Sequence, residues 1–153
     1  MKGQDFTLWA VVTADQRNSR RAADRVPAAL STLDAVAGDR LALPFERTAG
    51  DEIQALTGDP GAVVDIILAL TRLDDWHVGI GLGPVDQPLP DSTRAARGAA
   101  YLAARTAVDE ARVAPLVQLF GRRPPGTPYT WKEMNDPRLG EVAGALAKTG
   151  QFV

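Results

Sequence analysis

The chain begins with a run of apolar residues, Leu8 to Ala14, that is rich in strand-forming side chains. A nearly continuous apolar run of this length suits a central strand buried on both faces. It ends at Asp15, and the polar stretch Gln16 to Arg21 follows. From Arg20 to Val36 apolar residues recur three or four positions apart, which predicts a helix. Pro27 lies inside this helix and predicts a kink or a later start.

The next segment predicts a hairpin and a second helix. Leu41 to Arg47 indicates a strand, in which Pro44 favours an edge or bulge position. Gly50-Asp51 signals a turn, and Glu52 to Leu56 completes a hairpin across it. Asp59-Pro60 supplies the N-cap and the first position of a helix. The broad apolar face of this helix contains Val63, Val64, Ile66, Ile67 and Leu70.

A third strand is predicted from Trp76 to Val85, with His77 and three glycines on one face, where a backbone or a ligand can approach closely. A helix from Ser92 to Val113 follows, capped by Asp91 or Ser92, and Leu116 to Phe120 suggests a last strand. The order strand-helix-strand-strand-helix-strand-helix-strand predicts an α+β sandwich, with helices packed on a mixed or antiparallel sheet.

The predicted boundaries give one α/β domain at residues 1–121 and a proline-rich linker at residues 122–136. Pro-rich segments of this kind are semi-rigid spacers. Residues 137–153 then form a predicted C-terminal helical segment, with Leu139, Val142 and Leu146 on one face.

Composition narrows the function classes. The apolar share of 45% is that of a globular protein, and a formal net charge of −2 gives no bulk reason to expect nucleic-acid or membrane binding. The chain contains no cysteine, which excludes disulfides and thiolate metal sites. The first residues lack the apolar core of a signal peptide, and no apolar stretch is long enough to span a bilayer. We therefore expect a cytoplasmic protein.

Two carboxylates are the strongest candidates for chemistry. Asp15 ends the first strand, and Asp51 occupies the hairpin turn, so the two converge if the strand and hairpin are neighbours. Hard cations such as Mg²⁺ or Mn²⁺ take oxygen ligands, often only one or two from the protein. A cation also relieves the repulsion between two close carboxylates. The sequence thus predicts a metal site at Asp15 and Asp51, while a simple turn-capping role for Asp51 stays open.

The polar stretch after the first strand is a candidate anion site. Asn18, Ser19 and Arg20 stand before a predicted helix, where free backbone N–H groups and the helix dipole favour a phosphate. A solvated N-terminal turn capped by Asn18 or Ser19 explains the same residues. His77 is the only histidine, so a zinc-type site is not expected.

Four sequence pieces in order support a family resemblance. They are Asp15 with Asn18-Ser19-Arg20, the run Arg47 to Gln54, the glycine strand Val78 to Gly83, and Gly98 to Arg105. Together they resemble the SatD-like family of bacterial proteins over roughly residues 7–112. The layout is also similar to the catalytic domain of class III nucleotidyl cyclases and, more distantly, of GGDEF cyclases. That resemblance implies a ferredoxin-like, nucleotidyl cyclase-like fold.

The same resemblance implies roles for individual residues. Asp15 and Asp51 would hold metal ions on a nucleoside triphosphate. Arg47 stands where the cyclases often carry a base-recognising lysine, and Arg105 falls near the arginine that stabilises the transition state. Tyr101 stands where those cyclases carry an asparagine. The resemblance therefore implies nucleotide or metal binding more directly than turnover, and it implies a homodimer, because cyclase-type sites form between two subunits.

Three functions follow from these observations. The first is a cyclase-like domain that binds a nucleotide or phosphate ligand through a divalent metal. The second is a non-catalytic regulatory or interaction module, with a transcription-linked role, that keeps the fold without the chemistry. The third is nucleic-acid binding through residues 137–153, which resemble the first helix of a helix-turn-helix. The acidic net charge and the missing recognition helix make this third function the least expected.

Overall fold

The computed structural model describes residues 9–17, 21, 23–73, 75–111 and, for their backbone, 118–120. The elements are β1 (Trp9–Gln16), α1 (Val26–Ala37), the 3₁₀ turn η1 (Gly38–Arg40), β2 (Leu43–Ala49), β3 (Glu52–Thr57), α2 (Pro60–Leu73), β4 (Trp76–Gly83), the 3₁₀ turn η2 (Thr93–Ala95), α3 (Ala99–Ala111) and β5 (Gln118–Phe120).

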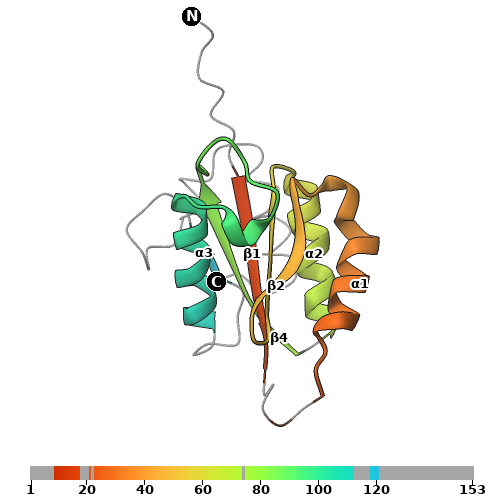
Figure 1. Cartoon of the computed structure of the whole chain (residues 1–153). Helices are drawn as coiled ribbons and strands as arrows, with labels where there is room; N and C mark the ends of the chain where they lie inside the picture. Colours follow the sequence, from red (N-terminus) through yellow and green to blue (C-terminus); the bar gives the residue numbers. More distant parts are fainter. Residues whose placement is uncertain (1–8, 18–20, 22, 74, 112–117, 121–153) are drawn as a thin grey trace, which may run out of the picture.

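The strands form one sheet in the order β2-β3-β1-β4-β5. The first strand pairs antiparallel with β3 on one side and with β4 on the other, and β5 runs parallel to β4. The predicted α+β sandwich with a mixed sheet is therefore confirmed. The β-α-β-β-α-β order of the first six strands and α-helices is ferredoxin-like and matches the nucleotidyl cyclase-like fold. In Figure 1, β1 runs through the middle, with α1 and α2 on one side and α3 on the other.

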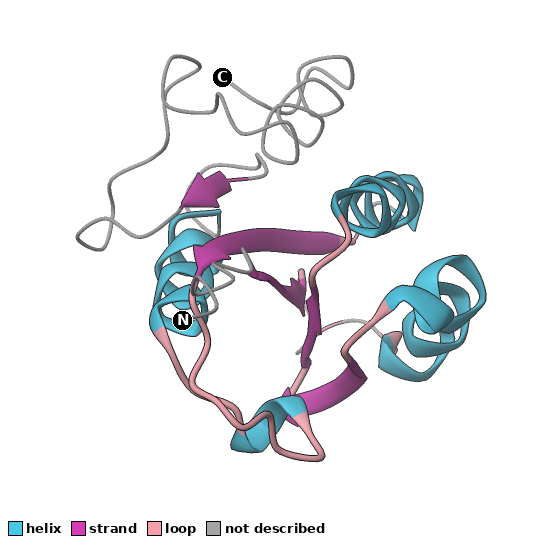
Figure 2. Cartoon of the chain, turned by 90° about the horizontal axis from the view of Figure 1, so that it is seen from above, coloured by secondary structure: helices cyan, strands magenta, loops and turns pink. Residues whose placement is uncertain are grey.

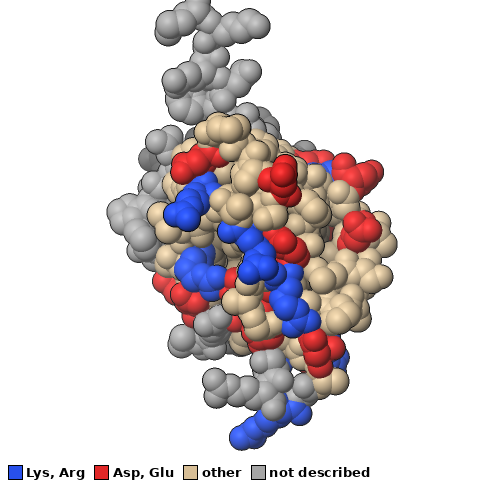
Figure 3. Space-filling view, in the orientation of Figure 1, with Lys and Arg blue, Asp and Glu red and all other residues tan. Residues whose placement is uncertain are grey.

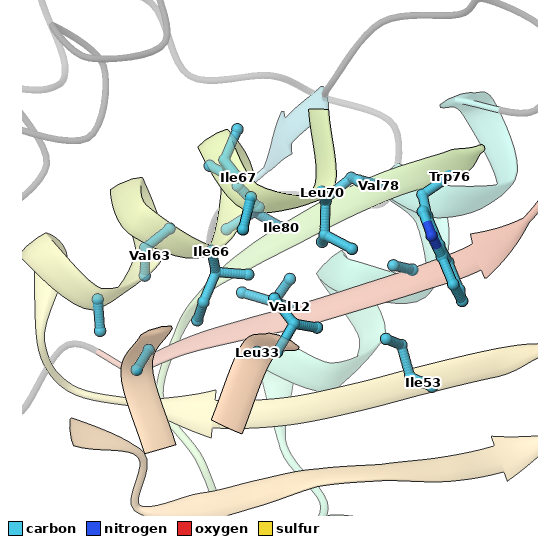
Figure 4. Packing of buried hydrophobic residues seen from close by; sticks show 14 of the residues in the cluster. Val12, Leu33, Ile53, Val63, Ile66, Ile67, Leu70, Trp76, Val78 and Ile80 are labelled. Carbon is cyan, nitrogen blue, oxygen red and sulfur yellow. The ribbon is translucent and has the colours of Figure 1, made fainter. Parts of the chain in front are cut away.

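One face of the sheet is covered by α1 and α2, and we call it the apolar face. Val12, Ile53 and Ile80 project from three neighbouring strands into a single cluster with Leu33 of α1 and Ile66 of α2. Figure 4 shows these side chains interdigitating between the two helices and the sheet. All five are completely or almost completely buried, so this layer supplies most of the hydrophobic stabilisation.

The opposite face is covered by α3 and by the segment that contains η2, and we call it the α3 face (Figure 2). Gly79 and Gly81 of β4 point toward α3. A Cβ atom at Gly79 would lie 2.7 Å from the backbone carbon of Ala107, and one at Gly81 would collide with the backbone of Ala100 and Ala104. The glycine strand therefore serves a close helix-to-sheet approach, which only glycine permits.

Two helix boundaries differ from the prediction. The first helix begins at Val26, with Pro27 in its first turn, because proline lacks the N–H that an interior helical position needs. Of the two predictions for Pro27, a kink or a later start of the helix, the later start is thus confirmed. The third helix begins at Ala99 and not at Ser92, so a cap at Asp91 or Ser92 was wrong. Gly98, at φ +141°, lies outside the helical conformation, so the helix cannot extend back through it. The Ala100 N–H donates to the Pro84 carbonyl and not to a carbonyl of a preceding helical turn.

The hairpin and the second helix follow the prediction closely. The second strand lies at the sheet edge, and its pairing with β3 is irregular between Leu43 and Glu46, where Pro44 stands. Asp59 caps α2, since its Oδ1 accepts the N–H of Gly61 at 2.8 Å. The linker at residues 122–136 and the helical segment at 137–153 lie outside the described residues.

Candidate functional site

The candidate site is built around the end of the central strand. Asp15 is 4% exposed and lies opposite Glu52 of β3 and His77 of β4. Strand alternation places Asp15 on the same face as Val11 and Thr13, which is the α3 face. Directly paired residues share a face, so Glu52, Asp15 and His77 form a row across three strands. Each of the three interacts with its surroundings, and Asp15 and Glu52 are both buried.

Asp51 lies in the turn between β2 and β3, directly before Glu52. The Gln16 N–H donates to the Asp51 carbonyl at 3.3 Å, which continues the β1–β3 ladder by one position. Gly50, at φ +52°, makes the turn tight enough for this pairing. The structure therefore brings the turn of Asp51 against the end of β1, next to Asp15. The side chain of Asp51 is half-buried.

Arg105 of α3 reaches the same region and is bound by a carboxylate of the chain. Its two terminal nitrogens donate to the two oxygens of Glu52, each at 2.6 Å, which is a bidentate pair. The Thr48 hydroxyl donates to Oε1 of Glu52 at 2.7 Å. Hydrogen bonding to Glu52 raises the pKa of Arg105, against the opposing effect of partial burial, and the negative charge of Asp15 contributes in the same direction. Arg105 is thus a permanent cation within electrostatic reach of both Glu52 and Asp15.

Arg47 occupies a different position. It donates to the Gly50 carbonyl at 2.6 Å and to Oδ2 of Asp24, also at 2.6 Å, so it ties the hairpin turn to the segment before α1. The hydrogen bond from Arg47 lowers the pKa of Asp24. The remaining predicted phosphate ligands, Asn18, Ser19 and Arg20, lie outside the described residues.

A buried glutamine holds the ends of the segment between β1 and α1. The side chain of Gln16 donates to the Ala23 carbonyl at 2.8 Å and accepts the Arg25 N–H at 2.9 Å. Arg25 also pairs with Asp75, whose carbonyl accepts the Arg17 N–H at 2.7 Å. These contacts fix the main chain on both sides of the predicted anion site.

A chain of hydrogen bonds crosses the α3 face above this row. The Tyr101 and Thr93 hydroxyls lie 2.9 Å apart, Thr93 donates to Gln54 at 3.2 Å, and the Gln54 amide donates to the hydroxyl of Thr13 at 3.0 Å. Burial raises the pKa of Tyr101. Tyr101 therefore directs its hydroxyl toward Thr93 and the buried polar groups of the α3 face.

The donor set can be compared with the needs of a cation. In the part of the chain that the structure describes, no group of three or more His, Asp or Glu side chains is arranged to hold a metal. Mg²⁺ and Mn²⁺ do not need one, because they keep several waters and bind through one or two carboxylates plus ligand phosphates. Asp15 and Asp51 fit that requirement in number and chemistry.

Glu52 and Gln54 were missed as site residues by the sequence reasoning. Both lie in the strand after the turn, at alternate positions, with Ile53 between them. Polar residues at every second position of a hairpin strand indicate a polar face, and that face is the α3 face, on which Asp15 also lies. This signal was available in the sequence.

Charge on the outer surface is mixed. Figure 3 shows Arg side chains interleaved with Asp and Glu side chains on the side of the molecule drawn in front. Three of the described ion pairs, Arg25–Asp75, Arg47–Asp24 and Arg105–Glu52, lie around the end of β1 and the hairpin turn. No helix in the described part of the chain is long and apolar enough to cross a membrane.

No family model and no curated protein matches this sequence. Two solved structures of a bacterial light-regulated adenylyl cyclase share its fold, with TM-scores of 0.53 and 0.52 and 14% identity. Each alignment covers 74% of this chain and 43% of the cyclase chain, so the present chain spans less than half of those proteins. At that identity the likeness establishes the fold, and the SatD-like resemblance stays a prediction.

Proposed function

We propose that the chain is a cyclase-like domain that binds a nucleotide or related phosphate ligand through Mg²⁺ or Mn²⁺, held by Asp15 and Asp51. The observation that carries the proposal is the position of Asp15. It is buried at the end of the central strand, against the turn that contains Asp51. Both the fold shared with an adenylyl cyclase and the nearby cation Arg105 support a phosphate ligand there.

The bound cation would orient the phosphates and neutralise part of their charge. Asn18, Ser19 and Arg20 follow β1 and are our candidates for phosphate contacts, since the backbone on both sides of them is anchored by Gln16. Arg47 holds the turn that presents Asp51 and keeps a partly exposed guanidinium beside it. In a catalytic version of this site, Arg105 is the candidate for stabilising charge on the transferring phosphoryl group.

Thermal unfolding with a panel of nucleotides tests the proposal. We expect ATP, GTP or another nucleoside triphosphate to raise the melting temperature only together with Mg²⁺ or Mn²⁺, because binding to the folded state alone stabilises it. Asp51→Asn removes one ligand charge from a half-buried turn and should abolish that shift. Asp39→Asn makes the same charge change in the exposed turn η1 and should leave it intact. Absence of a shift with every nucleotide would refute the proposal.

A second candidate is a regulatory or interaction module without catalysis. Two observations favour it. Two of the predicted cationic ligands, Arg47 and Arg105, are bound to the chain's own carboxylates, and the resemblance places Tyr101 where the cyclases carry an asparagine. Binding of metal and nucleotide with no product over many hours would support this version of the site.

We also propose a homodimer, because cyclase-type sites form between two subunits. Light scattering at micromolar concentration should give twice the chain mass of 16.3 kDa. A monomeric mass would count against a site shared between subunits.

A further inference from the structure

The pair between Arg105 and Glu52 occupies two of the donors that an anion would use. Glu52 is 5% exposed, and both of its oxygens accept from the same guanidinium. The side chain of Arg105 is 46% exposed, so it is the partner that a ligand can approach from solvent. A phosphate that takes the same two N–H donors must displace the Glu52 carboxylate, because the two donors form one bidentate pair at a time.

Displacing the guanidinium leaves Glu52 in an unfavourable place. Glu52 lies directly opposite Asp15 in the β1–β3 ladder, and paired side chains in such a ladder start about 4.5–5.5 Å apart. Thr48 continues to donate to Glu52, but a hydroxyl carries no compensating charge. Two buried carboxylates at this separation repel each other unless a positive charge lies close to them.

Asp15 would hold a divalent cation that would supply that charge. With Glu52 compensated in this way, Arg105 would be available to a phosphate, so binding of the cation and binding of the anion would each strengthen the other. Such coupling is reciprocal: if the cation raises the affinity for the anion by some factor, the anion raises the affinity for the cation by the same factor.

We propose that Glu52 is a specificity-determining residue that makes the site select cation-bound phosphates over free phosphates. By competing for Arg105, it weakens the binding of every anion that arrives without a metal. This inference rests on the proposed function, since it needs a cation at Asp15, and it assigns to Glu52 a role that the metal ligands and Arg105 do not have.

Calorimetric titration of the full chain with inorganic tripolyphosphate, with and without Mg²⁺, tests the inference. For the wild type we expect Mg²⁺ to lower the dissociation constant of tripolyphosphate at least about tenfold, which corresponds to about 1.4 kcal/mol. Glu52→Gln keeps the shape and the contact with Thr48 but removes the charge. We expect it to bind metal-free tripolyphosphate about tenfold more tightly than the wild type does, so the effect of Mg²⁺ falls below about threefold.

Asp109→Asn is the matched control. Asp109 also lies near Arg105, at 3.9 Å, but half of its side chain is exposed. Its removal should change neither dissociation constant by more than about twofold, because exposed pairs are weak. If Glu52→Gln does not fold, Glu52→Asp retracts the carboxylate by one methylene from Arg105 and should give a smaller gain in metal-free binding.

The outcomes separate the two proposals. Equal metal-free binding by the wild type and the folded Glu52 variants, with Mg²⁺ still tightening the anion, would overturn the role of Glu52 and leave the proposed function standing. Failure of the wild type and all variants to bind nucleotide or tripolyphosphate under any condition would overturn the proposed function, and this inference with it.

Discussion

The two faces of the sheet differ in what they bury. The apolar face packs branched aliphatic side chains of β1, β3 and β4 against α1 and α2. The α3 face buries Thr13, Asp15, Glu52, Gln54 and Thr93 beside a strand of glycines. Buried polar groups cost stability unless they are hydrogen-bonded, and on this face hydrogen bonds link Thr13, Gln54 and Thr93, while Glu52 pairs with Arg105.

The difference shows how one sheet separates stability from function. Residues 79 and 80 of β4 are neighbours, yet Gly79 admits the backbone of α3 and Ile80 fills the apolar cluster. Stabilisation from the apolar face allows the other face to hold charges near the end of β1. The following changes probe that division, from the largest expected effect to the smallest.

Ile80→Ala should produce the largest loss of stability. It removes three methyl or methylene groups from a fully buried position on the apolar face. We expect a loss of about 2–5 kcal/mol in the free energy of unfolding, measured by urea denaturation. Affinity for a metal–nucleotide complex, measured where the variant is still folded, should stay within a few-fold of the wild type. A variant that lost binding while keeping its stability would break the comparison.

Gly79→Ala makes the converse change one residue away. The added methyl group meets the backbone of Ala107 and Val108, which can move only if α3 shifts. We expect a loss of about 1–3 kcal/mol, also from urea denaturation. Because α3 positions Arg105, ligand affinity should fall together with stability. Wild-type stability in this variant would mean that α3 does not approach β4 so closely.

Arg105→Ala should cost less, because only one partner of the pair is buried. The substitution leaves the Glu52 charge near Asp15 with a hydroxyl donor from Thr48. Allowing for the half-exposed guanidinium, we expect a loss of about 1–2 kcal/mol. The control Asp109→Asn should lose no more than about 0.5 kcal/mol. Equal losses in the two variants would indicate that the bidentate pair contributes no more to stability than the exposed pair with Asp109.

The smallest effect is a change in pH dependence. Burial raises the pKa of Tyr101 above its usual 10.0, so the folded chain keeps this proton longer than the unfolded chain does. The corresponding stability is complete below pH 10 and is lost as the pH rises through the folded pKa. Tyr101→Phe should therefore show a shallower loss of stability above pH 10 in urea denaturation. An unchanged slope would contradict the buried position of this hydroxyl.

Much of the fold could be predicted from the sequence because its signals are local. The apolar run of β1, the Gly50-Asp51 turn and the Asp59-Pro60 start of α2 each depend on neighbouring residues only. The start of α3 was missed because the chain before it, at Gly98, packs closely against Val85 and the Ala100 N–H bonds to the Pro84 carbonyl, contacts that local patterns do not specify. The sequence signal at Asp91 and Ser92 is a valid capping pattern, but a tertiary contact outweighs it.

The candidate site was only partly predictable. The position of Asp15 at the end of a strand and of Asp51 in a turn followed from the pattern, and the pairing of β1 with β3 brings the turn that contains Asp51 to the end of β1. The partner of Arg105 was not foreseen, since 53 positions separate Arg105 from Glu52 and only the folded sheet joins them. Ion pairs of this kind depend on strand register and helix placement together, which local patterns do not specify.

The central claim is that a divalent cation binds beside Asp15 and Asp51 together with a nucleotide. Paramagnetic broadening by Mn²⁺ in the amide NMR spectrum, with ATP or GTP present, tests its location most directly. We predict that substoichiometric Mn²⁺ broadens the amides of Asp15, Gln16 and Asp51 and leaves those of Ile66 and Leu70 in α2 sharp. Broadening centred elsewhere, or the same broadening in Asp51→Asn, would contradict the account.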